Sequence, residues 1–143
     1  MKIVIDADAC PVTKIAERIA KECALSCTLV FDTSHIMQSD YSTVITVDKG
    51  ADSADLKIVS IVDRGDIVVT QDYGLAAMCL SRGARVVNQN GMVYDDSNID
   101  ALLFSRAAAA KIRRSGGRLK GPKKRDPSLN NAFEQALKNL INK

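Results

Sequence analysis

Carboxylates follow several short apolar runs of this chain, at the points where buried strands are expected to end. Asp6 closes the run K-I-V-I-D, and Asp8 follows shortly after it. Asp55 comes soon after the run T-V-I-T-V, and Thr70 and Asp72 close the run I-V-V-T-Q-D. Because the carboxyl ends of parallel strands meet at one edge of a sheet, we expect these side chains to converge there.

Converging carboxylates repel one another, and a hard divalent cation is the usual way to neutralise them. Oxygen ligands suit Mg²⁺ or Mn²⁺, and such ions activate water for attack on phosphate esters. The residues that we expect to bind the metal are Asp6, Asp52, Asp55 and Asp72. The expected catalytic set is Asp6, Asp8, Asp55, Thr70 and Asp72.

Most of these acids also have a structural interpretation as helix caps. Asp52 is placed to cap the next helix, and Asp55 would then lie in its first turn, where the helix dipole favours an acid. Asp8 and Asp72 are likewise placed shortly before expected helices. Asp6 differs because it ends an apolar strand, where a half-buried carboxylate is costly without a partner.

The other potential nucleophiles and metal ligands are isolated. His35 is the only histidine, which excludes a zinc site built on paired histidines. Cys10 lies beside the acids at an expected helix start, but no basic residue is near it in the sequence, and we interpret it as a packed side chain. The four cysteines form no C-x-x-C pair, and both glycine-rich nucleotide-binding motifs are absent.

The basic residues gather in the C-terminal part of the chain. Residues 1–105 carry 9 basic and 15 acidic residues, a balance of −6, whereas residues 106–143 carry 11 and 2, a balance of +9. Segment 106–125 contains nine lysines and arginines and no acid. Such a segment is typical either of a phosphate-backbone contact or of a solvated loop. The expected nucleic-acid contacts are Arg113, Arg114, Arg118, Lys120, Lys123, Lys124 and Arg125.

Hydrophobic periodicity predicts the elements that must position these residues. The expected strands are 2–6, 28–31, 43–47, 67–70, 84–87 and 92–94. The expected helices are 12–24, 53–62, 73–81, 99–114 and 128–140. Pro11 would open the first helix, Asn90-Gly91 would form a two-residue hairpin turn, and Ser97 with Asp100 would form a capping box.

Alternation of strands and helices predicts an α/β fold of three layers, with a mostly parallel central sheet. The 143 residues suit a single domain, 1–143, with the basic segment 106–125 and a C-terminal helix at 128–141. No apolar run is long enough to span a membrane, and the N-terminus reaches Asp6 too early for a signal peptide. We therefore expect a cytoplasmic protein without membrane contact, and the sequence carries no signal for an oligomeric state.

Three segments resemble the YaiI/YqxD family of uncharacterised bacterial proteins. They are I-D-A-D-A-C-P-V at 5–12, V-V-T-Q-D-Y-G-L-A at 68–76, and G-P-K-K-R at 121–125 followed by an amphipathic helix. These segments extend from the start of the chain to near residue 140. The family has no established activity, so the resemblance implies kinship and little about function.

The layout is also similar to that of PIN-like nuclease domains. Asp6 matches the acid at the end of their first strand, Asp55 the acid at the start of a middle helix, and Thr70 with Asp72 their T-x-D motif. This resemblance implies a parallel sheet and a cluster of acids that binds Mg²⁺ or Mn²⁺. The chain departs from many such nucleases in lacking a clear helix glutamate between the first and the middle acid.

Three functions remain open from the sequence. The first is a metal-dependent ribonuclease in which Asp6, Asp55 and Asp72 bind the ion and the basic segment binds RNA. The second is a non-catalytic RNA-binding or ribosome-associated module in which the acids are caps. The third is a phosphatase similar to haloacid dehalogenases. In it, Asp6 and Asp8 would be the nucleophile and the acid, Thr70 the hydroxyl residue, and Asp95-Asp96 the metal ligands. We rank it lower because Pro11 leaves little room for that fold's usual flap.

Overall fold

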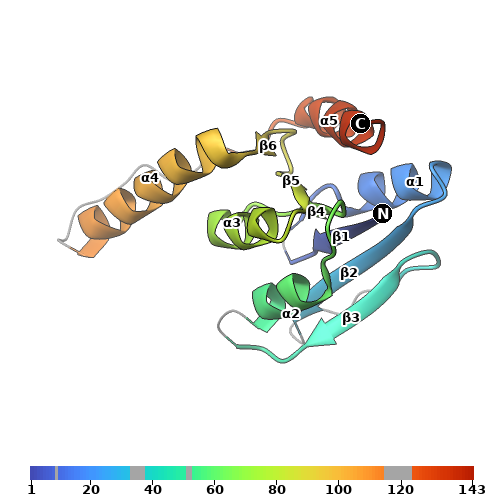
Figure 1. Cartoon of the computed structure of the whole chain (residues 1–143), viewed down its shortest axis with the longest axis horizontal. Coiled ribbons are helices and arrows are strands. Elements are labelled where there is room, and N and C mark those ends of the chain that lie inside the picture. The colour runs from blue at the N-terminus through green and yellow to red at the C-terminus, as the bar shows by residue number, and fades with distance from the viewer. Residues whose placement is uncertain (9, 33–37, 51–52, 115–123) are drawn as a thin grey trace.

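A six-stranded sheet lies between two layers of helices in the computed structural model, which describes residues 1–143 except 9, 33–37, 51–52 and 115–123 (Figure 1). The strands are β1 (Lys2–Asp6), β2 (Ser26–Asp32), β3 (Thr43–Val47), β4 (Ile67–Val69), β5 (Arg85–Val87) and β6 (Val93–Tyr94). The helices are α1 (Thr13–Glu22), α2 (Ser53–Ile61), α3 (Tyr73–Ser81), α4 (Asp96–Arg114) and α5 (Leu129–Ile141). The expected α/β fold with a mostly parallel sheet is confirmed.

The strand order reverses in the middle of the sheet. The order across the sheet is β3-β2-β1-β4-β5-β6, and the pairings from β3 to β5 are all parallel. Only the pairing of β6 with β5 is antiparallel. Ligands of open α/β sheets bind at the carboxyl ends of the strands where the order reverses. Here that point lies between the ends of β1 and β4, which are Asp6 and the residues that follow Val69.

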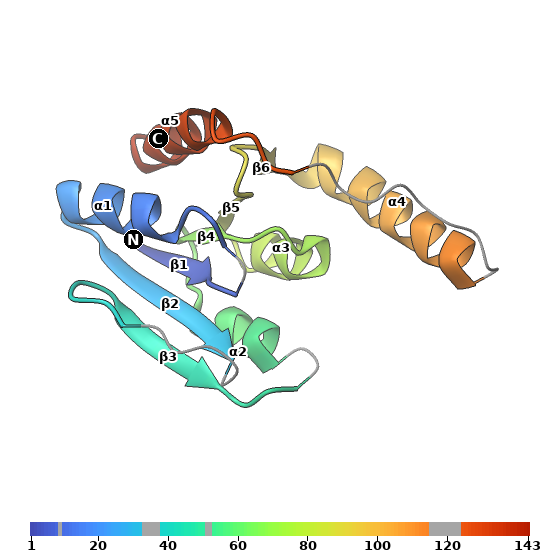
Figure 2. The ribbon, with the colours of Figure 1, turned by 180° about the vertical axis from the view of Figure 1, so that it is seen from behind.

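Both faces of the sheet are covered. Ile3 and Ile5 of β1 pack under α1 and α5, while Val4 faces the layer formed by α2, α3 and the start of α4. Figures 1 and 2 show these two layers from opposite sides. Strands that are buried on both faces need continuous apolar sequence, which explains the short β-branched runs.

Two helix starts differ from the expectation. α1 begins at Thr13, so Pro11 lies in the preceding turn and does not open the helix. α4 begins at Asp96, because Asp95 Oδ1 accepts hydrogen bonds from the backbone nitrogens of Ser97 (2.9 Å) and Asn98 (2.8 Å). The predicted capping box at Ser97 is therefore wrong. A carboxylate is a stronger acceptor than a hydroxyl, and the N-terminal end of the helix dipole favours its charge.

The β5–β6 hairpin also differs from the expectation. The backbone nitrogen of Asn88 donates to the carbonyl of Met92 (2.9 Å), which leaves a three-residue loop, 89–91, in place of the predicted two-residue turn. Asn88 Oδ1 closes this loop by accepting from the nitrogens of Asn90 and Met92, both at 2.9 Å. Gly91 takes φ +90°, a backbone conformation that L side chains rarely adopt.

The helix α4 extends away from the rest of the molecule (Figures 1 and 2). Its first turns pack on the sheet layer through Ile99, Leu102 and Leu103. Farther along, Phe104 is 76% exposed and Ile112 is 43% exposed. No helix among the described residues combines the length and the apolarity needed to cross a bilayer.

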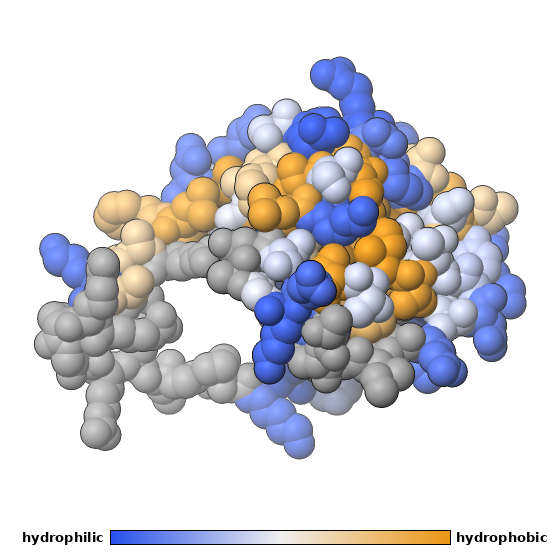
Figure 3. Space-filling model, turned by 90° about the horizontal axis from the view of Figure 1, so that it is seen from below, coloured by the Kyte–Doolittle hydropathy of each residue, from blue (hydrophilic) through white to orange (hydrophobic). Residues whose placement is uncertain are grey.

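Apolar side chains also reach the surface beside the edge strand β3. Figure 3 shows them in the middle of the face that carries α2 and β3, with hydrophilic residues around them. A groove between these elements is lined in part by Ile45, Val47 and Leu56, and Leu56 is 65% exposed. This edge of the sheet therefore keeps apolar surface open to solvent.

Candidate functional site: an acidic hollow at the strand ends

A hollow of about 390 Å³ opens at the point where the strand order reverses. Its walls are Asp6, Asp8, Gln71, Asp72 and Tyr73, and we call it the acidic hollow. A smaller space adjoins it, lined by Asp6, Asp8, Cys10, Val69, Thr70, Gln71 and Gln89. Four of the five expected catalytic residues, Asp6, Asp8, Thr70 and Asp72, therefore lie around these two spaces.

Thr70 links the two strand ends through hydrogen bonds. Its Oγ1 donates to Asp6 Oδ2 (2.9 Å) and accepts from the backbone nitrogen of Asp72 (3.0 Å). Its own carbonyl accepts from the hydroxyl of Tyr94 (3.3 Å), which ties the end of β4 to β6. Thr70 is only 3% exposed, so a single buried side chain fixes the positions of both acids.

Asp72 both caps α3 and lines the acidic hollow. Its Oδ1 accepts from the backbone nitrogen of Leu75 (3.1 Å), so the structural interpretation as the cap of α3 is correct. The same side chain lines the acidic hollow. Capping holds the carboxylate beside the hollow in a set orientation.

Asp8 joins neighbouring strands and caps no helix. Its Oδ2 accepts from the backbone nitrogen of Asp32 (3.2 Å), at the end of β2. The N-cap position of α1 is Val12, and no side chain caps that helix. The alternative interpretation of Asp8 as a cap is therefore wrong. The turn after β1 directs the side chain across the strand ends towards β2.

The electrostatics of the site centre on Asp6. Burial raises the pKa of this carboxyl to about 6, although the hydrogen bond from Thr70 opposes the shift. The negative charges of Asp55, Asp8 and Asp72 raise it further, in that order. Asp55 lies in the first turn of α2, so that turn comes close enough for its charge to act on Asp6. None of the described charges that shift the pKa of Asp6 is positive.

The carboxylates of the acidic hollow suit a hard cation that keeps several waters better than a metal ion bound entirely by protein side chains. Within the described part of the chain, no three Asp, Glu, His or Cys side chains are already gathered as a metal cluster. Mg²⁺ commonly binds one or two protein carboxylates and keeps several waters, so Asp6 with Asp72 meets that need. The pKa of Asp6 is raised by burial and by the neighbouring acids, an environment that a positive charge would offset. Asp52, the fourth expected ligand, lies outside the described residues.

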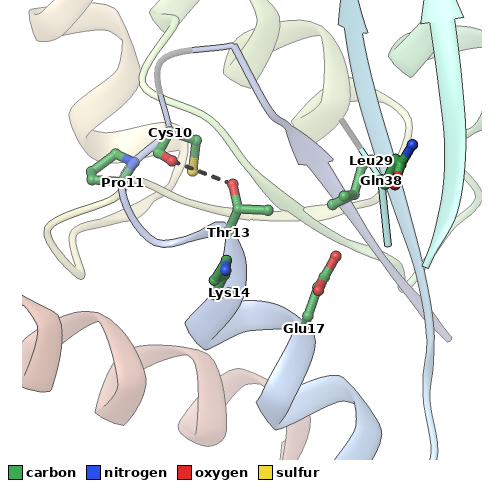
Figure 4. A pocket seen from close by; sticks show the side chains of 7 residues that line it. All are labelled: Cys10, Pro11, Thr13, Lys14, Glu17, Leu29 and Gln38. Carbon is green, nitrogen blue, oxygen red and sulfur yellow. Dashed lines mark hydrogen bonds between the residues drawn. The ribbon is translucent and has the colours of Figure 1, made fainter. Parts of the chain in front are cut away.

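A second hollow of about 440 Å³ lies beside α1. Figure 4 shows Lys14 and Glu17 arising from α1, with Leu29 and Gln38 across from Glu17. Among the described residues that line it, Glu17 is the one carboxylate, and Glu17 Oε1 accepts a hydrogen bond from Ser42 Oγ (3.0 Å). We assign the candidate chemistry to the acidic hollow because several acids line it, whereas a single described acid lines the hollow beside α1.

Cys10 lines both the α1 hollow and the smaller space beside the acids. Burial raises the pKa of its thiol, and hydrogen bonds from Thr13 and Val12 lower it only in part. A neutral, packed thiol agrees with the interpretation from the sequence.

The expected nucleic-acid contacts are described only in part. Arg118, Lys120 and Lys123 lie outside the described residues, and so do the side chains of Arg113 and Arg114 near the end of α4. Lys124 is exposed, and Arg125 is partly buried. The structure therefore gives side-chain positions for two residues of this set.

Sequence reasoning missed two amide side chains, Gln71 and Gln89, that line the space beside the acids. Gln71 stands within the expected T-x-D motif, between Thr70 and Asp72. Gln89 follows the end of β5, and applying the strand-end rule to that strand as well would have found it. Together they give the site neutral hydrogen-bonding groups beside its acids.

Comparison with known proteins agrees with the resemblance found in the sequence. The profile of the family described as "Uncharacterized BCR, YaiI/YqxD family" matches residues 4–143. A UPF0178 protein of Ruminiclostridium cellulolyticum is 55% identical over 137 residues, which cover 96% of this chain and 90% of that protein. One from Clostridium acetobutylicum is 46% identical over 143 residues, covering 99% and 97%.

A third relative, a UPF0178 protein of Exiguobacterium sibiricum, is 46% identical over 141 residues, covering 99% of this chain and 96% of that protein. No solved structure matches, so the likeness to PIN-like nucleases stays a prediction from the sequence. The family match spans β1 to the C-terminus and includes every residue of the acidic hollow. The chain therefore belongs to the YaiI/YqxD family of uncharacterised bacterial proteins.

Proposed function

We propose that this protein is a Mg²⁺- or Mn²⁺-dependent phosphodiesterase that acts on RNA at the acidic hollow. The observation that carries the proposal is the position of Asp6 together with the raised pKa of its carboxyl. This carboxyl lies at the reversal of strand order, and burial and three neighbouring acids raise its pKa to about 6. Strongly perturbed groups in a hollow mark candidate functional sites.

The residues of the site fall into distinct roles. Asp6 and Asp72 would hold the cation, and the negative charge of Asp55, in the first turn of α2, would add to its attraction without direct ligation. The bound ion would lower the pKa of a coordinated water and neutralise charge on the phosphate. Thr70 would keep Asp6 and Asp72 oriented through its two hydrogen bonds. Asp8, which also lines the hollow, would accept a proton from the attacking water.

RNA as substrate rests on the charge distribution. The body of the chain is acidic, whereas segment 106–125 carries nine basic residues. Such a segment supports contact with a phosphate backbone. The chain holds three Tyr, three Phe and no Trp, which disfavours a stacking platform for bases. We therefore propose binding led by the backbone, with weak sequence preference.

The phosphatase alternative loses one of its expected ligands. Asp95 Oδ1 accepts from the nitrogens of Ser97 and Asn98 and from Ser97 Oγ (2.6 Å), so this carboxylate is engaged as the cap of α4. Asp95 does not line either of the spaces around Asp6. The phosphodiesterase accounts for the acids that do meet at the hollow.

The test is cleavage of end-labelled RNA with Mn²⁺, Mg²⁺ or a chelator. We expect metal-dependent cleavage that falls at least about a hundredfold in Asp6→Asn and in Asp72→Asn, because each change removes a charged ligand. Asp63→Asn is the matched control, since Asp63 lies away from the hollow and its side chain is 80% exposed. Its cleavage rate should equal that of the unmodified protein.

Three other results would redirect the proposal. Cleavage that survives both Asp6→Asn and Asp72→Asn would place the activity elsewhere. Release of phosphate from a simple monoester, through a covalent intermediate on Asp6, would favour the phosphatase. Salt-dependent RNA affinity without cleavage, unchanged by either substitution, would favour the binding module.

A further inference from the structure

Arg125 differs from Lys124, its exposed neighbour in segment 106–125, because all the nitrogens of the Arg125 side chain donate hydrogen bonds. Its Nε donates to Asn90 Oδ1 (3.0 Å), and its Nη2 donates to the carbonyl of Gln89 (2.8 Å). Its Nη1 donates to Asn130 Oδ1 (2.6 Å) in the first turn of α5. The side chain therefore fastens the start of α5 to the β5–β6 loop.

A second, independent contact holds the same two segments together. Gly91 lies so close to α5 that a Cβ on it would come within 2.6 Å of the carbonyl oxygen of Ala132. Real Cβ atoms do not approach a backbone oxygen so closely, so a side chain here would push the loop and the helix apart. Arg125 and Gly91 thus form one anchor between α5 and the loop.

The anchor lies beside the acidic hollow. Gln89, whose carbonyl binds Arg125, lines the space around Asp6 and Asp8. The charge of Arg125 also acts on Cys10, another residue of that space: burial raises the pKa of Cys10, and Arg125 is among the groups that partly lower it. Two separate observations therefore place Arg125 next to the hollow.

We infer that Arg125 is a positioning residue: it holds Gln89 at the smaller space that adjoins the acidic hollow, and it fixes the backbone of its chain neighbour Lys124, whose side chain serves as a cation for an incoming RNA phosphate. This inference rests on the proposed function and deepens it. It also changes the expectation from the sequence, in which Arg125 itself was a phosphate contact. Among the described residues, Lys124 makes no hydrogen bond or ion pair, and it is exposed.

The experiment separates an anchor from a phosphate contact. Affinity for a fluorescein-labelled oligouridine is measured in a chelator, so that nothing is cleaved, from about 50 to about 200 mM salt. Amide hydrogen exchange of residues 89–92 and 130–133 is measured on the same proteins. The variants are Arg125→Lys, Gly91→Ala and Lys124→Ala.

Arg125→Lys keeps the charge but loses the planar fork. We expect at least about fivefold faster exchange in both segments and about threefold to tenfold weaker RNA binding, because two or more hydrogen bonds are lost. Gly91→Ala changes no charge and should give the same two effects. Lys124→Ala should lower the salt slope by about 0.7, the value for one phosphate of a single strand, and leave exchange unchanged.

α5 stays fastened in the first two variants through other contacts. Phe133, Leu137 and Leu140 are buried in the core, and Arg85 Nη1 donates to the carbonyl of Leu140. Both proteins are therefore expected to fold, which circular dichroism would verify. If Gly91→Ala unfolds the chain, Arg125→Lys decides the question alone.

Unchanged exchange and unchanged affinity in Arg125→Lys would overturn the inference and return Arg125 to the phosphate contacts. Faster exchange with unchanged affinity would reduce Arg125 to a support of the fold and overturn its role at the hollow. A protein that binds no oligouridine would overturn both that role and the RNA part of the proposed function. A protein that binds RNA but never cleaves it would defeat only the proposed catalysis.

Discussion

Two aspartates at opposite ends of the central strands, Asp66 and Asp6, differ in the charges and hydrogen-bond donors around them. At the amino end, Asp66 is 4% exposed, and its Oδ2 accepts from Lys2 Nζ at 2.6 Å. It also accepts from the backbone nitrogens of Lys2 (3.0 Å) and Asp63 (2.9 Å). At the carboxyl end, Asp6 has one hydroxyl donor, Thr70, and several acids around it.

The difference separates a structural carboxylate from a functional candidate. Burial would raise the pKa of Asp66, but hydrogen bonds from Lys2 and Asp63 lower it overall. Burial raises the pKa of Asp6, and its neighbours add to the shift. Burial takes both carboxyls out of water. Among the described residues, a lysine and two backbone nitrogens compensate Asp66, whereas only the hydroxyl of Thr70 compensates Asp6. A carboxylate that is compensated so little at a strand end is what a cation or a substrate group can stabilise.

The largest expected effect on stability is at Asp66, at the amino end of the strands. Asp66→Asn should lower the free energy of unfolding by about 3 to 4 kcal/mol at pH 7, because it breaks a buried ion pair and leaves Lys2 without its main partner. Chemical denaturation measures this change. Asp63→Asn, at an exposed partner of the same lysine, should cost under about 0.5 kcal/mol. Equal losses in the two variants would contradict the structural role of Asp66.

The pH dependence of stability should have opposite signs at the two ends. The pKa of Asp6 is about 6 in the folded protein, against an ordinary value of 3.8, so its contribution to stability is fully present below pH 3.8 and is lost as the pH rises through 6. Two pKa units amount to about 3 kcal/mol at most. Asp66, with a lowered pKa, contributes stability above pH 3.8 that is lost as the pH falls through its folded pKa.

Denaturation curves of Asp6→Asn isolate the first contribution. This variant should lose the decline in stability between pH 4 and pH 7 and be at least as stable as the unmodified protein at pH 7. A decline of unchanged size would show that Asp6 is ionised without cost.

A divalent metal ion should stabilise the folded protein by compensating the charge of Asp6 at the carboxyl end of the strands. Mn²⁺ at about a hundred times its dissociation constant should add about 2.7 kcal/mol of stability, which thermal unfolding would record as a rise of several degrees. Asp6→Asn should lose most of this rise, whereas Asp63→Asn should keep it. Equal stabilisation of both variants would place the metal away from the hollow.

The smallest expected effect is at Thr70. Thr70→Val removes the hydroxyl that donates to Asp6 and accepts from Asp72, so we expect a loss of about 1 kcal/mol. The pKa of Asp6 should rise further, and the decline of stability should shift to higher pH. Thr70→Ser keeps the hydroxyl and should restore both properties. A valine variant with an unchanged pH profile would argue against the link between Thr70 and Asp6.

The gathering of acids at the carboxyl ends of the strands was largely predictable from the sequence, because it depends on short local runs of residues. Apolar runs fix where strands end, and the parallel arrangement brings Asp6, Thr70 and Asp72 together at one edge of the sheet. The cap of α4 was not, because the helix begins at Asp96, capped by Asp95, and Ser97 therefore lies inside its first turn. The three partners of Arg125 were not predictable either, since they depend on how α5 packs against a distant loop.

The bond between Thr70 and Asp6 joins residues 64 positions apart in the chain. Loop closure over such a distance costs entropy that is recovered only when β4 pairs with β1. A growing chain in which β4 has not yet formed therefore contains acidic residues of the hollow, but they are not yet brought together as a site. Competence to bind a cation at the hollow should appear late in folding, together with the pairing of the two halves of the sheet, and would serve as a direct reporter of that step.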